Sequence, residues 1–180
     1  MRKVLVIGSG GAGKSTFARR LGELLDLEVI HLDVLYWNPG WVETPKPEWA
    51  ERVAELVQRD AWIMDGNYSG TFDIRLKACD GIIFLDMPRL VCLRRVLKRS
   101  MLYRNRSRPD MGAGCQEKLD LEFIKFLLWI WNYPKRTRPK IINWMRENAG
   151  SKKVVWLRSP AEAEKYLAEV SKTSFIIERR

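Results

Sequence analysis

A glycine-rich run near the N-terminus constrains the fold of this chain more than any other feature. Residues 8–15 read Gly-Ser-Gly-Gly-Ala-Gly-Lys-Ser, which is the complete pattern G-x-x-x-x-G-K-[ST]. An apolar, β-branched run at 4–7 precedes it and predicts a buried strand, and apolar residues at helical spacing follow it over 17–25. Strand, glycine loop and helix together predict a P-loop, which binds a nucleoside triphosphate.

Each part of this run has a physical role in holding phosphates. The glycines allow successive backbone N–H groups to point inward, and the helix N-terminus adds positive potential. We expect Lys14 to reach the β- and γ-phosphates as a catalytic cation and the Ser15 hydroxyl to ligate Mg²⁺. ATP and Mg²⁺ are therefore the expected cofactors. The predicted ATP-binding residues are Gly8, Ser9, Gly10, Gly11, Ala12, Gly13, Lys14, Ser15 and Thr16.

Apolar strands alternate with helical patterns along the chain, which predicts βαβ units around a parallel sheet. We expect strands at 3–8, 28–32, 61–65, 81–86 and 153–157, and helices near 14–25, 47–59, 88–103, 117–132, 135–148 and 160–170. The length of 180 residues fits one domain, expected over 1–170 and followed by a tail at 171–180.

Composition excludes several classes of protein. The three cysteines are widely spaced and there is one histidine, so the sequence supports neither a zinc site nor a disulfide framework. Free thiols favour a reducing, cytoplasmic location. The longest apolar run, at 126–131, is too short to span a bilayer, and we expect no membrane partner. The sequence leaves the oligomeric state open.

Two aspartates end apolar strands and are candidates for a second contact to Mg²⁺. Asp65 follows the run 61–64 and Asp86 follows the run 82–85. Asp86 stands two residues before a proline that opens a helix, so we interpret it as a helix N-cap. Asp65 precedes a Gly-Asn-Tyr turn that frees the strand end to face a ligand. We therefore assign Asp65 to the outer shell of the metal and to substrate binding.

A third aspartate, Asp33, ends the second predicted strand. A carboxylate there can orient or deprotonate the hydroxyl of a phosphoryl acceptor, while the alternative is that it caps the turn at 34–36. Trp37 and Tyr68 fall in loops expected to face a ligand and can stack on a base or ring.

The basic excess is concentrated after the fourth predicted strand. The formal net charge is +10, and the arginines of this region include Arg99, Arg104 and Arg108. Phosphoryl transfer needs cations near the equatorial oxygens, so we predict a catalytic lid over about 104–138. Arg138 is expected to bind the acceptor from the other side. The alternatives are solvated helix faces, or a surface that contacts nucleic acid.

Several segments resemble the adenylate-kinase-like proteins called DNA topology modulation proteins. They are the P-loop, the stretches 33–41, 62–68 and 84–89, and the region 103–140 with Arg-Pro-Asp-Met and Trp-Asn-Tyr-Pro. The resemblance covers about 3–159. It implies a P-loop NTPase of the nucleoside-monophosphate-kinase-like, three-layer fold, with a parallel five-stranded sheet ordered 2-3-1-4-5 and an arginine-rich helical lid.

Departures from true adenylate kinases leave the phosphoryl acceptor open. The turn after Asp65 reads Gly-Asn-Tyr where those enzymes carry Gly-Phe-Pro-Arg, and the segment 33–46 is short for an AMP-binding arm. The favoured hypothesis is a small-molecule kinase acting on a nucleotide, a nucleoside or a similar hydroxyl compound. The alternative is an ATP-dependent DNA-binding regulator that affects DNA topology, although no helix-turn-helix, zinc-finger or RNA-recognition motif is present.

Overall fold

The structure is a computed structural model that describes residues 1–104, 106, 111, 112 and 114–177. Five parallel strands form the main sheet in the order β2-β5-β1-β6-β7. They are β1 (Lys3–Gly8), β2 (Val29–His31), β5 (Trp62–Asp65), β6 (Gly81–Leu85) and β7 (Lys153–Leu157). Numbered among themselves in chain order they give 2-3-1-4-5, so the predicted α/β fold with this sheet is confirmed.

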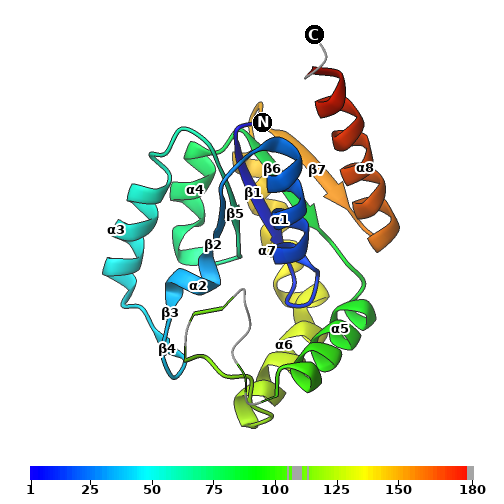
Figure 1. Ribbon diagram of the computed structural model, residues 1–180. Coiled ribbons are helices and arrows are strands. Elements are labelled where there is room, and N and C mark those ends of the chain that lie inside the picture. The colour runs from blue at the N-terminus through cyan, green and yellow to red at the C-terminus, as the bar shows by residue number, and fades with distance from the viewer. Residues whose placement is uncertain (105, 107–110, 113, 178–180) are drawn as a thin grey trace.

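Helices cover both faces of the sheet and make three layers (Figure 1). One face packs against α1 (Lys14–Leu25) and α8 (Pro160–Ile177). The other packs against α3 (Lys46–Leu56), α4 (Phe72–Ala78) and α7 (Arg138–Asn148). A parallel sheet covered on both sides explains why its strands read as continuous apolar runs.

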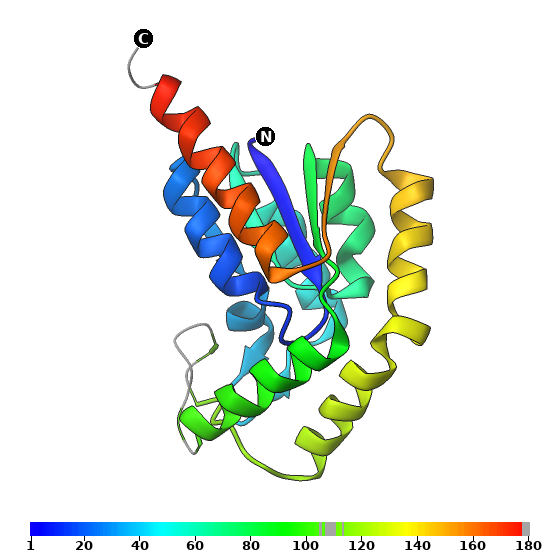
Figure 2. The same cartoon turned by 90° about the vertical axis from the view of Figure 1, so that its right-hand side faces the viewer.

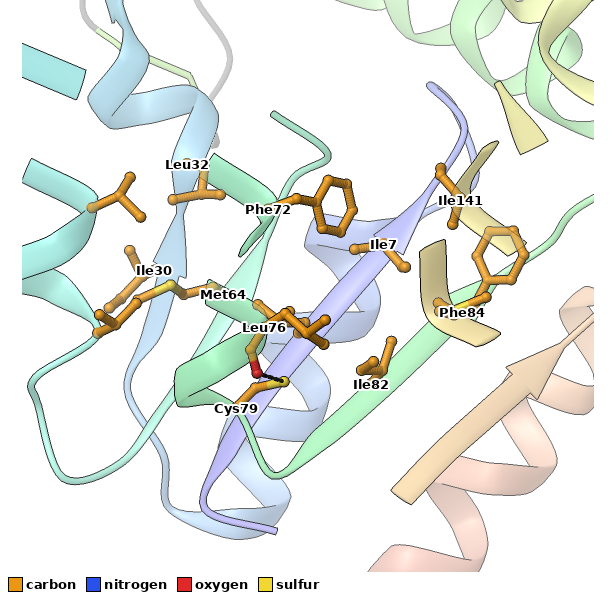
Figure 3. Packing of buried hydrophobic residues seen from close by; sticks show 14 of the residues in the cluster. Ile7, Ile30, Leu32, Met64, Phe72, Leu76, Cys79, Ile82, Phe84 and Ile141 are labelled. Carbon is orange, nitrogen blue, oxygen red and sulfur yellow. Dashed lines mark hydrogen bonds between the residues drawn. The ribbon is translucent and has the colours of Figure 1, made fainter. Parts of the chain in front are cut away.

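Successive strand residues point into two separate layers of the core. On β1, Val4 and Val6 pack on the α1 side, whereas Leu5 and Ile7 pack on the side of α4 and α7. Figure 3 shows this second layer, where Ile7, Ile82 and Phe84 from the sheet meet the side chains of Phe72, Leu76 and Ile141 from the helices. Side-chain direction along each strand therefore decides which helices a residue meets.

All five strands end at the same edge of the sheet, because all are parallel. The strands β5 and β6 flank β1 on opposite sides, so the chain order reverses there. The predicted P-loop follows β1 at this edge, which is where open α/β sheets bind their ligands.

Two helices cross the same edge below the P-loop (Figure 2). They are α5 (Arg89–Leu102) and α6 (Leu121–Arg136). The helix predicted over 117–132 corresponds to α6, which begins and ends four residues later in the chain. It begins late because the Asp120 carboxylate caps the helix by accepting from the Phe123 N–H at 3.0 Å, and Pro134 does not end it.

Short elements in two connections were not predicted. The connection after β2 contains α2 (Leu32–Tyr36) and an antiparallel hairpin of β3 (Trp37–Asn38) and β4 (Val42–Glu43). The 3₁₀-helix η1 (Ser69–Thr71) leads into α4, which was also missed.

The C-terminal helix α8 continues through residue 177, beyond the predicted helix end at 170. No helix ends at the predicted boundary between a domain at 1–170 and a tail at 171–180. That boundary stays a prediction. Within the described residues, no helix is both long enough and apolar enough to cross a membrane.

Candidate nucleotide site

The predicted P-loop forms a tight turn between β1 and α1 that packs closely against two other elements. A Cβ atom at Gly11, whose φ is 75°, would lie 2.3 Å from the Cys92 carbonyl oxygen, so α5 leaves room only for glycine. A Cβ atom at Gly8 would lie 2.5 Å from the Leu85 carbonyl oxygen on β6. Close packing against two other elements thus requires glycines that the motif supplies.

The predicted phosphate-binding side chains converge on this turn. Lys14 begins α1, and its Nζ donates to the Ser9 carbonyl oxygen at 3.1 Å. Ser15 stands beside it in the first helical turn and is half-buried. The hydroxyl oxygen of Ser9 is buried without a hydrogen-bond partner. A lysine folded onto the loop and an unsatisfied hydroxyl fit the binding of an anion with many acceptor oxygens.

Sequence reasoning missed Asn67, which clamps the start of the P-loop. Its Oδ1 accepts from the Gly8 N–H at 3.1 Å, and its Nδ2 donates to the Gly8 carbonyl oxygen at 2.9 Å. The amide therefore satisfies both polar groups of a buried backbone unit 59 residues away. Its position in the turn after Asp65 was the only sequence signal.

Sequence reasoning also missed Arg75, a fully buried arginine on α4. Its guanidinium donates to the carbonyl oxygens of Gly66 (2.9 Å), Asn67 and Tyr68 (2.8 Å), and its Nε donates to that of Thr71 (3.3 Å). Burial lowers the pKa of Arg75 to about 10. Four carbonyl partners stabilise this buried charge and fix the path of the turn after β5. The sequence signal is an arginine that stands between Phe72 and Leu76 in an apolar helical stripe.

The two aspartates considered for the metal lie on opposite faces of the sheet. Side chains alternate along β5, so Asp65 lies on the same face of the sheet as Ile63, which is the face that α1 covers, whereas Met64 lies on the other face. Its carboxylate is buried and lies 2.9 Å from His31 Nδ1. This side of the sheet is where a metal held by Ser15 would need an acidic neighbour.

Asp86 follows Leu85 and so shares with Phe84 the opposite face of the sheet. The N-cap of α5 is Pro88, so the predicted capping role of Asp86 was wrong. Its carboxylate instead accepts from Arg138 Nε at 2.8 Å and Nη2 at 2.8 Å, and from Trp156 Nε1 at 2.9 Å. Arg138, predicted to bind the acceptor, thus ties the start of α7 to the sheet.

The structure brings together three of the residues predicted for the acceptor, Asp33, Trp37 and Tyr68, but not Asp65 or Arg138. Asp33 lies in the first turn of α2 and accepts from the Tyr68 hydroxyl at 2.6 Å. Burial, and then the negative charge of Asp33, raise the pKa of Tyr68. Tyr68 has a φ of 32°, which is strained for a residue other than glycine. The Tyr36 ring connects them with Trp37, at centroid distances of 4.6 Å to Tyr68 and 5.1 Å to Trp37.

The predicted lid arginines occupy different environments. Arg99 Nε lies 3.6 Å from the buried carboxylate of Glu117, and Arg104 is exposed. Arg108 lies outside the described residues.

The two long connections meet each other. The Gly40 N–H donates to the Gly114 carbonyl oxygen at 3.2 Å, and Trp41 Nε1 donates to that of Gln116 at 2.8 Å. Residues 114–117 of the predicted lid thus rest on the β3–β4 hairpin, beside the acceptor residues.

Two hollows on the described surface lie away from these residues. One, of about 300 Å³, lies between α1 and α8, and the other, of about 390 Å³, lies between α3 and α4. Within the described part of the chain, no group of three or more His, Cys, Asp or Glu residues is placed to hold a metal ion.

The chain is similar to solved structures of other proteins. No protein-family model and no curated protein matches the chain. The crystal structure of an unliganded sugar kinase from Janibacter sp. HTCC2649 is similar at 16% sequence identity, with a TM-score of 0.47. The similarity covers 98% of this chain and 93% of that one.

Proposed function

We propose that this chain is an ATP-dependent phosphotransferase that moves the γ-phosphate of MgATP to a nucleotide, a nucleoside or a similar small hydroxyl acceptor. The observation that carries the proposal is the P-loop turn, with Lys14 and Ser15 in the first turn of α1. Asp65 supports it from the neighbouring strand, because its side chain lies on the sheet face that α1 covers.

ATP would supply the phosphoryl group, and Mg²⁺ would neutralise part of its charge. Backbone N–H groups of residues 9–16 would surround the phosphates. Lys14 would exchange the Ser9 carbonyl oxygen for phosphate oxygens. Ser15 would ligate the metal directly, and Asp65 would lie in the outer shell of the metal.

Asp33 is the proposed acceptor-orienting residue. Its carboxylate already accepts from the hydroxyl of Tyr68, so it can accept from an acceptor hydroxyl in the same way. Trp37 and Tyr68 offer ring faces beside it for a base or sugar. Binding through these groups would set the acceptor oxygen in line with the γ-phosphate.

Arginines of the lid region complete the proposal. Arg99, Arg104 and Arg108 would provide cations when the lid closes on the phosphates. Arg138 can bind an acceptor phosphate only by leaving Asp86, so its place in the site depends on that exchange. A single domain over 1–170 and a cytoplasmic location remain part of this proposal.

Two measurements on the same protein test it. Titration calorimetry with MgATP should show binding, and ADP release should appear with at least one member of a panel of nucleosides, nucleotides and sugars. Lys14→Ala should lower turnover by about two or more orders of magnitude, because one such cation is worth several kcal/mol in the transition state. Turnover within about tenfold of the wild type would remove Lys14 from the mechanism.

The alternative of a DNA-binding regulator rests on the net charge of +10. Duplex-DNA titrations at two salt concentrations distinguish it, because phosphate contacts make affinity fall steeply with salt. Tight binding near physiological salt, without ATP turnover, would favour the regulator. Weak binding at low salt would not, because any strongly basic domain shows it.

A further inference from the structure

The candidate site has two sides that differ in charge. In the sheet, β2 and β5 lie on one side of β1, and β6 and β7 lie on the other. We call residues 31–44 and 65–71, at and after the ends of β2 and β5, the β2 side. We call Asp86, α5 and the start of α7 the β6 side, because Asp86 and α5 follow β6 and Arg138 bonds to Asp86. The P-loop follows β1 and lies between the two sides (Figure 1).

The β6 side presents an arginine to the P-loop. Arg95 on α5 donates from Nη1 to the Ala12 carbonyl oxygen at 3.0 Å. A Cβ atom at Gly13 would lie 3.1 Å from the same nitrogen, so this guanidinium lies against the residue that caps α1. The P-loop is therefore basic toward the β6 side, which suits the phosphates of ATP.

The β2 side has the opposite character. Its sequence contains neither lysine nor arginine, and it carries the carboxylates of Asp33, Glu43 and Asp65. Its histidine, His31, lies 2.9 Å from Asp65. Aromatic rings contact one another beside Asp33, with the Tyr36 ring centroid 4.6 Å from that of Tyr68 and 5.1 Å from that of Trp37. This side therefore offers negative charge and ring faces to a ligand.

Two arginines from neighbouring helices bond to the backbone of the β2 side. Arg52 on α3 donates to the Leu35 carbonyl oxygen at 2.8 Å and lies 3.6 Å from the Glu48 carboxylate. Arg75 on α4 is buried among the carbonyl oxygens of the turn after β5. Both guanidinium groups support the fold of this side, and a ligand phosphate would have to displace these contacts.

The lid brings other arginines near the β2 side. The Glu117 N–H donates to the Arg106 carbonyl oxygen at 3.1 Å, and residues 114–117 rest on the β3–β4 hairpin. The side chains of Arg104 and Arg106 are exposed. In the proposed function, lid cations close over the phosphate that is transferred, so an incoming acceptor meets the residues of the β2 side first.

We propose that the acceptor is an uncharged ring compound with hydroxyl groups, a nucleoside or a free sugar, and that compounds already carrying a phosphate are rejected. This inference rests on the proposed phosphotransferase function. A phosphate monoester carries a charge of about −1.5 to −2 at neutral pH. Beside Asp33 and its acidic neighbours, that charge is repelled. An uncharged acceptor instead meets ring faces and a carboxylate that accepts its hydroxyl.

The transfer step needs no further reactant. The acceptor hydroxyl oxygen bonds to the γ-phosphorus, and the bond from that phosphorus to the β–γ bridging oxygen breaks, which releases ADP. The hydroxyl proton passes to Asp33, whose Oδ1 accepts from Tyr68, and then to water. The products are ADP, a phosphate monoester of the acceptor and one proton.

Matched pairs of acceptors test this inference on the full chain. ADP release at a fixed MgATP concentration is measured with each common nucleoside and its 5′-monophosphate, and with each of several hexoses and its 6-phosphate. The best acceptor should be uncharged, and its kcat/KM should exceed that of its phosphorylated counterpart by at least about thirtyfold. The nucleoside and hexose arms show which ring the β2 side holds.

Replacement of Asp33 by asparagine tests whether charge causes the discrimination. Calorimetry with the best pair and a non-hydrolysable MgATP analogue gives the ratio of the two affinities without depending on turnover. Asp33→Asn should lower this ratio at least about fivefold in favour of the phosphorylated compound, whereas a merely structural role would weaken both compounds alike. Asp60→Asn is the matched control, because Asp60 is exposed and precedes β5 at the opposite edge of the sheet, and the ratio should not change.

Two results would overturn the inference and leave the phosphotransferase function standing. One is a phosphorylated acceptor that is used as well as its uncharged counterpart or better, and the other is an unchanged affinity ratio in Asp33→Asn. Absence of MgATP binding, or of ADP release with every acceptor, would overturn the proposed function and the inference with it.

Discussion

Replacement of Asn67 by alanine tests whether the turn after β5 holds the P-loop in place. The change removes the acceptor for the Gly8 N–H and the donor to the Gly8 carbonyl oxygen. Both backbone groups belong to Gly8, which is buried, and the methyl group of alanine can neither donate nor accept a hydrogen bond.

The expected destabilisation follows from these two bonds. Each neutral hydrogen bond contributes about 1 kcal/mol net, and a buried group left unsatisfied costs about 1–3 kcal/mol. We therefore expect Asn67→Ala to lower the free energy of unfolding by about 2–4 kcal/mol. For a chain of this length a loss of about 3 kcal/mol corresponds to a Tm lowered by roughly 6–12 °C.

Urea unfolding and MgATP calorimetry measure the two consequences. Asn67→Asp keeps an acceptor for the Gly8 N–H but places a carboxylate beside the phosphate site, so it should weaken MgATP binding more than Asn67→Ala does. Asn148→Ala is the matched control, because it removes one exposed amide bond to the Trp144 carbonyl oxygen and should cost less than about 0.5 kcal/mol. An Asn67→Ala protein with unchanged stability and unchanged ATP affinity would refute the clamp.

Five other substitutions, in three groups, test the remaining parts of the site. Asp33→Asn should slow phosphoryl transfer while the affinity for MgATP stays nearly unchanged. Asp65→Asn should instead lower the affinity for MgATP or raise the Mg²⁺ concentration that activity requires. Equal losses of MgATP affinity in both variants would show that the two roles are wrongly assigned. Arg104→Ala and Arg108→Ala should each lower turnover by about two or more orders of magnitude without weakening DNA binding, and the opposite pattern would argue against a lid. Arg75→Lys should destabilise the fold by more than about 2 kcal/mol in urea unfolding, because an ammonium group cannot reach all the carbonyl oxygens that the guanidinium holds.

The sheet could be predicted because each strand is a short apolar run between turn residues. Burial on both faces produces such runs, and the structure places all five strands within about one residue of the predicted bounds. Helix α4 was missed because it has only seven residues and carries Arg75 on its buried side. A charge in the apolar stripe removes the periodic signal on which helix prediction depends.

The choice between Asp65 and Asp86 shows the limit of the same signal. Strands buried on both faces have no alternation of apolar and polar residues, so neither run indicates on which face its last residue lies. That face follows from the pairing register, in which Val6 lies opposite both Asp65 and Ile83. Register is a property of the assembled sheet, and it places Asp86 on the face where its carboxylate meets Arg138 and Trp156.

The turn at 66–68 shows why the P-loop could be found from sequence and its supports could not. The glycine motif carries its whole geometry in eight adjacent residues, whereas Asn67 acts on Gly8 and Tyr68 acts on Asp33 across gaps of 59 and 35 residues. Arg75 holds three successive carbonyl oxygens of this turn, so it fixes both contacts at once. The turn thus connects the proposed nucleotide side with the proposed acceptor side through the side chains of Asn67 and Tyr68. Arg75 holds this turn through backbone carbonyl oxygens, which have no sequence signature of their own.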